Sequence, residues 1–352
     1  MSRDVTFILP GPIARTGGYI YDRRMIDGLR ALGWLADSIV IDGSFPFPDA
    51  TTRGTTERIF ACLPDRRLVI VDGLALGAIP EIVESHARRL RIVGLVHLPL
   101  GADPTRDAET SAQLAAADGR ALRAAALVIV TSRATLPMLD AYGLTNDRVV
   151  VIEPGTDAVP SARGSGQSGS IELLCVATVN AGKGHATLLE ALAALRDRRW
   201  HLTCAGSLTR DPATAHLLQR MVADLKLHDR VSLVGELDEL PLAAAYDAAD
   251  IFVLATLRET YGMAVAEALA HGLPIVSTTT GAIPPLVGEE AGLLVPPGDV
   301  DALGRALAAV LDDRTLRDRL RDGARRAGAR LPTWTQAAER MSATLEGLVS
   351  HG

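Results

Sequence analysis

Short apolar runs alternate with amphipathic stretches along most of the chain. The apolar runs are rich in Val, Ile and Leu, which is typical of strands that are buried on both faces of a sheet. They lie at residues 5–9, 37–41, 68–71, 91–96, 126–130 and 148–152, and again at 171–177, 200–205, 230–234, 251–254, 274–277 and 292–295.

Helical patterns separate these predicted strands. The main helices are expected at 18–32, 78–88, 107–124, 184–196, 213–227, 239–248, 262–271 and 299–312. Strands that alternate with helices indicate parallel sheets, because a parallel connection needs a crossover that covers one face. The predicted fold class is therefore α/β, with two Rossmann-like doubly wound domains facing a cleft. A ligand is expected at the carboxyl ends of the strands.

One polar segment interrupts the alternation. Residues 159–170 read VPSARGSGQSGS, a Gly- and Ser-rich stretch without periodicity that is typical of a linker. The chain of 352 residues is also long enough for two domains. We therefore expect a first domain at 1–158, a linker at 159–170, a second domain at 171–333, and a terminal helix within 334–352 that could pack back on the first domain.

Composition excludes some classes of function. Hydrophobic residues make up 48% and charged residues 22% of a chain with a net charge of −6, which argues against a dedicated nucleic-acid binder. The three cysteines (Cys62, Cys175 and Cys204) show neither zinc-ligand spacing nor a disulfide framework. Cys175 and Cys204 each lie in an apolar run and are predicted to be small buried side chains.

The amino terminus predicts a cytoplasmic location. Residues 5–9 form an apolar run that is too short for a secretory signal, and no run approaches the ~18 apolar residues that a membrane span needs. Contact with the inner face of a membrane is left open.

The segment from Arg258 to Pro274 carries the clearest chemistry. It follows a predicted strand, opens a helix near Gly262 and ends that helix at Gly272. The start of a helix beyond a parallel strand is an anion site, because free N–H groups and the helix dipole both favour negative charge. Glu259 precedes this helix, and Glu267 lies roughly 7 Å along its axis at ~1.5 Å per residue. Such carboxylates can accept hydrogen bonds from both ends of a ligand that carries hydroxyl groups.

Each glutamate also has a structural explanation. Glu259 could cap the helix, and Glu267 could be a solvated helix residue. The helix is apolar nearly all round, however, so it is expected to be buried, and a carboxylate on a buried helix needs partners.

With these residues, the chain resembles glycosyltransferase family 4 over almost its entire length. The motif is a pair of glutamates separated by seven residues, with a glycine soon after the first. The other matching segments are Lys183-Gly184, Ala205-Gly206-Ser207, 231–250, 292–298, Gly17-Gly18, His97 and Pro154-Gly155-Thr156-Asp157.

The resemblance implies a GT-B fold and a retaining, metal-independent transfer from a nucleotide-diphosphate sugar to a hydroxyl group, without a cofactor. The catalytic residues would be His97, Glu259 and Lys183. Glu267 would hold the ribose, Glu259 the donor sugar, and Lys183 the diphosphate. The other implied donor-binding residues are Gly17, Gly18, Thr178, Leu237, Tyr261, Gly262 and Met263.

Several of these roles have alternatives. Lys183 could be a surface residue, although glycines flank it. Gly17-Gly18 could be only a turn, and His97 a core histidine bonded to the backbone. Thr178 stands where the family often has an arginine, so Lys183, Arg15 or Arg258 would have to meet the diphosphate.

Other functions remain open on the sequence alone. A GT-B nucleotide-sugar epimerase would share the fold, and so would a glycan phosphorylase or a non-catalytic nucleotide-sugar binding module. Neither the base and sugar of the donor nor the acceptor, whether glycan, lipid or small molecule, is disclosed by the residues.

Overall fold

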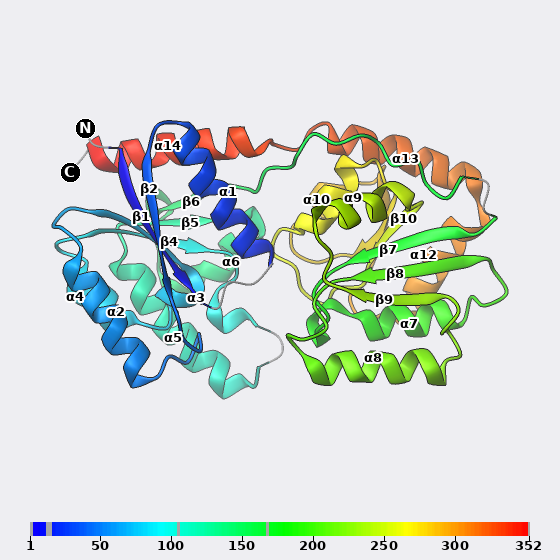
Figure 1. The fold of residues 1–352 in the computed structure, drawn as a ribbon, viewed down its shortest axis with the longest axis horizontal. Coiled ribbons are helices and arrows are strands. Elements are labelled where there is room, and N and C mark those ends of the chain that lie inside the picture. Colours follow the sequence, from blue (N-terminus) through cyan, green and yellow to red (C-terminus); the bar gives the residue numbers. More distant parts are fainter. Residues whose placement is uncertain (1–2, 12–15, 104–105, 167–168, 351–352) are drawn as a thin grey trace. The chain divides into compact units, whose positions relative to one another are not determined.

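The computed structural model describes residues 3–11, 16–103, 106–166 and 169–350. The chain divides into two compact units. Unit 1 comprises Met1–Gly155 and Pro332–Gly352, and unit 2 comprises Thr156–Leu331. Each unit contains one six-stranded sheet with helices packed against it (Figure 1).

The sheet of unit 1 has the order β2-β1-β3-β4-β5-β6, and its strand pairs are parallel. Its strands are β1 (Asp4–Pro10), β2 (Leu35–Ile41), β3 (Leu68–Asp72), β4 (Arg91–Val96), β5 (Leu127–Val130) and β6 (Val149–Val151). Side chains alternate between two cores, because successive residues of a strand point to opposite faces. Phe7 and Ile70 belong to one core, and Ile8 and Val71 belong to the other.

Helices cover both faces of this sheet. They are α1 (Gly17–Ala31), α2 (Ala50–Cys62), α3 (Gly73–Leu76), α4 (Pro80–His86), α5 (Ala108–Ala124), α6 (Leu136–Leu139) and α14 (Trp334–Ser350). Helix α14 lies beside α1 (Figure 1), where Trp34 Nε1 donates to Ser342 Oγ at 2.9 Å. The carboxyl-terminal helix is therefore part of unit 1.

The sheet of unit 2 has the order β12-β11-β10-β7-β8-β9, again with parallel pairs. Its strands are β7 (Ile171–Val176), β8 (Trp200–Ala205), β9 (Val231–Gly235), β10 (Ile251–Leu254), β11 (Ile275–Thr278) and β12 (Gly292–Val295). The helices are α7 (His185–Ala193), α8 (Pro212–Asp224), α9 (Glu239–Ala248), α10 (Met263–Ala270), α11 (Ile283–Val287), α12 (Val300–Asp312) and α13 (Arg314–Gly328).

The order of the second sheet defines a switch point between β7 and β10. From β7 the chain proceeds through β8 to β9 on one side, and from β10 through β11 to β12 on the other. The loops that follow two such strands run in opposite directions and leave a crevice at their carboxyl ends, where ligands of this fold class bind. Lys183 follows β7 and Glu259 follows β10, so both lie at this switch point.

The predicted strands and fold class are confirmed, because each of the twelve predicted runs forms a strand in the described part of the chain. The longer helices α2 and α13 and the short helices α3, α6 and α11 were not predicted. Helix α2 contains Gly54 and four threonines, which are poor helix formers, but Asp49 caps it by accepting from Thr52 N at 2.7 Å. The predicted helix at 78–88 is shorter, since α4 spans Pro80–His86.

No helix among the described residues is both long and apolar enough to cross a membrane.

The segment predicted as a linker lies against unit 2. Ala162 N donates to His271 O at 2.8 Å, and Gly164 N donates to Asp247 O at 2.9 Å. By its contacts the chain divides between Gly155 and Thr156, so the described part of 159–170 belongs to unit 2.

Candidate functional site

The loop that carries Lys183 is held to the neighbouring strand ends. Ala177 N donates to Ala205 O at 2.9 Å, and Val179 N donates to Ser207 O at 3.0 Å. The Asn180 side chain then accepts from Lys183 N at 3.2 Å and starts a short 3₁₀ turn over Ala181–Lys183. The main chain at Lys183 is therefore fixed by hydrogen bonds on both sides.

Gly184 allows this loop to approach the end of β10. Its φ of +66° is a left-handed conformation, and a Cβ there would lie 1.9 Å from the carbonyl oxygen of Ala255. Leu257 N donates to Gly182 O at 2.8 Å across the same contact. Only glycine fits this position, because a side chain would meet backbone that cannot move aside.

The loop that carries Glu259 is packed equally closely. Thr256 Oγ1 donates to Arg258 O at 2.9 Å. Gly281, with φ of +54°, passes beside Glu259, and a Cβ on Gly281 would lie 1.6 Å from the Glu259 carbonyl oxygen. The position of the Glu259 backbone is thus set by the chain on two sides.

An ion pair joins the two loops. Lys183 Nζ donates to Glu259 Oε2 at 2.7 Å, and the two side chains are 26% and 15% exposed. Because the pair is partly buried, water and salt screen its attraction less than they would screen a fully exposed pair. Lys183 is therefore not a solvated surface lysine, but is directed to the switch point of unit 2.

Helix α10 begins beside this pair. Its cap is Gly262, with φ of +94°, and no side chain among the described residues caps it. The explanation of Glu259 as a helix cap is therefore wrong. The amide groups of the first turn, beginning at Met263, have no partners inside the helix, and they favour an anion at this end.

Glu267 has the partner that its buried helix requires. Tyr246 on α9 donates its hydroxyl to Glu267 Oε2 at 2.9 Å. The Tyr246 ring stacks on His271 with ring centroids 4.8 Å apart. Burial, followed by the charge of Glu267, holds the pKa of Tyr246 well above its usual value. The hydroxyl therefore remains a donor and orients the carboxylate. Tyr246 was missed in the sequence, because nothing in its spacing marks it as a neighbour of Glu267.

The remaining predicted residues of unit 2 also follow the carboxyl ends of strands in its sheet. Thr178 is half-buried in the loop after β7, and Leu237 follows the edge strand β9. Tyr261 is buried and Met263 is half-buried at the start of α10. Of the two arginines considered as replacements for the missing family arginine, Arg258 is exposed beside Glu259. Arg15 lies outside the described residues.

In unit 1, His97 follows β4 and contacts two buried carboxylates. Its Nε2 lies 2.9 Å from Asp22 Oδ1 on α1 and 3.4 Å from Asp72 Oδ2 at the end of β3. Its side chain is 21% exposed, whereas both aspartates are almost fully buried. The alternative of a histidine bonded only to backbone is wrong. Asp22 and Asp72 were missed, because they are far from His97 in the sequence.

The carboxylates determine the protonation of this cluster. Burial lowers the pKa of His97, but the charge and hydrogen bond of Asp22, with the charge of Asp72, leave it raised. Burial, together with the charge of Asp22, raises the pKa of Asp72 to about 7. Asp22, at the shorter distance, is therefore the main partner of His97.

Gly17 and Gly18 are the first two residues of α1. A Cβ at Gly18 would lie 3.0 Å from Cδ2 of His97, so the glycine leaves space for the imidazole. The two residues thus belong to a helix start rather than to a separate turn, and Gly18 packs on His97.

Comparison with known proteins points to one family. Residues 170–313 match the family described as glycosyl transferases group 1. The chain is 28% identical over 228 residues to the MMP alpha-(1->4)-mannosyltransferase of Mycolicibacterium hassiacum, covering 64% of this chain and 54% of that protein. It is 31% identical over 246 residues to the mannosylfructose-phosphate synthase of Agrobacterium fabrum, with the same coverage of 64% and 54%. The chain spans just over half the length of these curated relatives.

Solved structures share the fold over nearly the whole chain. Sucrose-phosphate synthase from Thermosynechococcus elongatus superposes with a TM-score of 0.82 at 23% identity, covering 99% of this chain and 100% of that one. Anabaena HepE, solved with UDP-glucose, gives a TM-score of 0.79 at 17% identity, covering 98% of this chain and 99% of that one. The two Rossmann-like units have the architecture of these GT-B structures.

The His97 cluster generates a pH prediction. Asp22→Asn should lower the pKa of His97, because the main charge that raises it is lost while burial remains. NMR titration of the imidazole measures this change, and Asp27→Asn, at an exposed position of the same helix, is the control. The pKa of His97 is raised in the folded chain. The stability that this pair supplies is therefore complete at pH values below the pKa of His97 in the unfolded chain, and it is lost as the pH rises through the pKa of His97 in the folded chain. An unchanged pKa of His97 in Asp22→Asn would contradict the proposed pairing.

Proposed function

We propose that this chain, whose residues 170–313 match the group 1 glycosyltransferases, moves a sugar from a nucleotide-diphosphate sugar to a hydroxyl group of an acceptor. The family match lies in unit 2 and agrees with the resemblance based on Glu259 and Glu267. The observation that carries the proposal is the Lys183–Glu259 ion pair at the switch point of unit 2, beside the start of α10.

In the proposal, the diphosphate binds Lys183 and the amide groups that begin α10. A diphosphate would compete with Glu259 for the Lys183 ammonium, because both offer anionic oxygens at hydrogen-bond distance. Lys183 would then meet the charge of the leaving group, and Glu259 would turn to hydroxyls of the donor sugar. The ion pair keeps both charges compensated until the donor arrives.

Glu267 is proposed to bind the ribose hydroxyls. An ionised carboxylate has about four acceptor positions, so a bond from Tyr246 leaves acceptor capacity for vicinal hydroxyls. The Tyr246 hydroxyl fixes the orientation of the carboxylate at 2.9 Å, and this lowers the entropy lost when the nucleotide binds. Leu237, after β9, would lie near the base of the nucleotide. Main-chain atoms there could bind the base, and such recognition would leave no characteristic side chain in the sequence.

The leaving charge would be stabilised without a metal ion. A lysine, a helix start and backbone amides that are already in position can stabilise developing negative charge, because they need little rearrangement during the reaction. Retention of configuration is proposed through attack on the face from which the nucleotide leaves, with the departing phosphate accepting the acceptor's proton. The family resemblance supports this step.

His97 is proposed to take part in the transfer, with Asp22 holding its imidazole in one orientation. The acceptor is proposed to be a hydroxyl of a glycan, a lipid or a small molecule. HepE was solved with UDP-glucose, so UDP-glucose is a first candidate donor for this chain.

The proposed activity is tested by a donor screen. UDP-, GDP-, ADP- and dTDP-sugars are compared by thermal shift, and the donor that raises the melting temperature is assayed for sugar transfer in EDTA. We expect transfer to continue during brief EDTA treatment. A loss restored by magnesium would contradict the metal-independent mechanism, and isomerisation of the donor alone would indicate an epimerase. Binding without transfer to any hydroxyl acceptor would indicate a binding module.

The ribose role of Glu267 is tested separately. Glu267→Ala should weaken binding of the free nucleoside diphosphate by roughly 10- to 100-fold, because hydrogen bonds to a charged group contribute about 1.5–3 kcal/mol each. Isothermal titration calorimetry measures the affinity, and Glu239→Ala, at an exposed position at the start of α9, is the matched control. Equal affinities of Glu267→Ala and the native chain would refute the assignment.

A further inference from the structure

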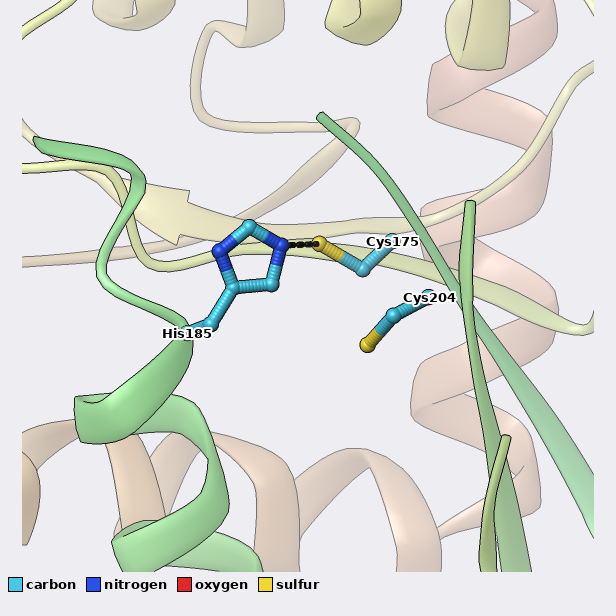
Figure 2. A group of neighbouring side chains, drawn as sticks. All are labelled: Cys175, His185 and Cys204. Carbon is cyan, nitrogen blue, oxygen red and sulfur yellow. Dashed lines mark hydrogen bonds between the residues drawn. The ribbon is translucent and has the colours of Figure 1, made fainter. Parts of the chain in front are cut away.

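The geometry points to a zinc-binding site in the interior of unit 2, formed by Cys175, His185 and Cys204. Figure 2 shows these three side chains, which come from two strands and the start of a helix. None of the three takes part in the donor site proposed above. Their ligand atoms all lie within 4.8 Å of one another, and all three residues are buried.

The fold brings these residues together from separate parts of the sequence. Cys175 on β7 and Cys204 on β8 are register partners on neighbouring parallel strands. Two register partners point to the same face of a sheet. His185 is the first residue of α7, and its Nε2 lies 3.8 Å from Cys175 Sγ (Figure 2).

The distance between Cys175 Sγ and His185 Nε2 is close to that expected in a tetrahedral zinc site. With zinc–sulfur bonds of about 2.3 Å and zinc–nitrogen bonds of about 2.0 Å, neighbouring sulfur and nitrogen ligands are separated by roughly 3.6 Å. The observed 3.8 Å between Cys175 Sγ and His185 Nε2 requires only a small side-chain adjustment. Two thiolates and one imidazole leave the fourth position for a small ligand such as water.

Charge balance favours a divalent ion with an affinity for sulfur. Two thiolates compensate the charge of Zn²⁺, and neutral imidazole adds none, so the assembled site has no net charge. A neutral site suits a buried position, where an uncompensated charge would be costly. Mg²⁺ and Ca²⁺ are poorly matched, because they prefer oxygen ligands.

The surroundings of the His185 ring leave Nε2 available for a metal ion. The residue is 3% exposed, and its Nδ1 has no hydrogen-bond partner among the described residues. Its Nε2 makes one long contact, to the Cys175 sulfur. A buried imidazole normally has stronger partners, and leaving it without them costs free energy. A bond from zinc to Nε2 would replace this long contact with a stronger one, whereas Nδ1 would carry the ring proton and would gain no partner from the metal.

Zinc at this position would join β7, β8 and α7 at the base of the loop that carries Lys183. Cys175 is the last residue but one of β7, and His185 follows Gly184 directly. Because metal binding to a folded chain adds to folding free energy, the ion would stabilise unit 2.

The first test uses the native chain, without a polyhistidine tag, from cells grown with zinc. Inductively coupled plasma mass spectrometry should find about one zinc per chain after dialysis. Replacement of zinc by Co²⁺ should give the intense visible absorption of tetrahedral cobalt with thiolate ligands. Native chain that retains no zinc and takes up neither ion would overturn the proposal.

Variants identify the ligands. Cys175→Ala with Cys204→Ala, and separately His185→Gln, should reduce the retained zinc to background while circular dichroism shows folded protein. Cys62→Ser and His216→Ala change an exposed cysteine and an exposed histidine and should retain zinc. Retention of zinc by the folded ligand variants would place the ion elsewhere. A Cys175–Cys204 disulfide, detected by peptide mass spectrometry in freshly purified protein, would also overturn the proposal.

Discussion

The ammonium of Lys183 and the carboxylate of Glu259 meet at 2.7 Å where β7 and β10 end, and the proposed chemistry depends on this pair. A lone lysine at the switch point would have to be partly desolvated without compensation, and so would a lone glutamate. Together they compensate each other at the switch point, which is where ligands of this fold class bind. An arriving diphosphate can take the place of the carboxylate, and each partner of the pair then has a role toward a different part of the donor.

Backbone packing fixes where these two charges lie. Gly184 passes the Ala255 carbonyl, and Gly281 passes the Glu259 carbonyl, at distances that exclude a Cβ. Asn180 and Thr256 add side-chain hydrogen bonds within the same loops. The positions of Lys183 and Glu259 therefore follow from close contacts between main chains, which are harder to deform than contacts between flexible side chains.

Local pattern in the sequence predicted much of this arrangement. The β-branched apolar runs predicted the strands, and the strand–turn–helix context of Glu259 predicted its place at a sheet edge. The apolar surroundings of Glu267 also required a buried partner. The identity of that partner, Tyr246, could not be predicted, because it depends on how α9 packs against α10.

The same limit applies to the clusters formed across strands. Asp22 and Asp72 meet His97 because β1, β3 and β4 are neighbours in the sheet and α1 covers them. Cys175 and Cys204 meet because β7 and β8 pair in one particular register. Strand order and register depend on contacts that are distant in sequence, so spacing alone does not reveal them.

Helix α2 was missed for a different reason, since a capping side chain and tertiary packing outweigh its poor intrinsic propensity.

The central claim is that Lys183 binds the diphosphate, and the composition of the chain offers a direct test. Lys183 and Lys226 are its only lysines, and Lys226 is exposed after α8. Reductive methylation with ¹³C-formaldehyde labels the two lysine ε-amino groups and the α-amino group and retains their charge, and Lys183→Ala and Lys226→Ala assign the two lysine signals in the NMR spectrum. Without added divalent metal ions, a nucleoside diphosphate that binds the chain should shift the Lys183 signal in a saturable manner and leave the Lys226 signal unchanged. Saturable binding measured by calorimetry on the same labelled sample, without a shift of the Lys183 signal, would contradict the account.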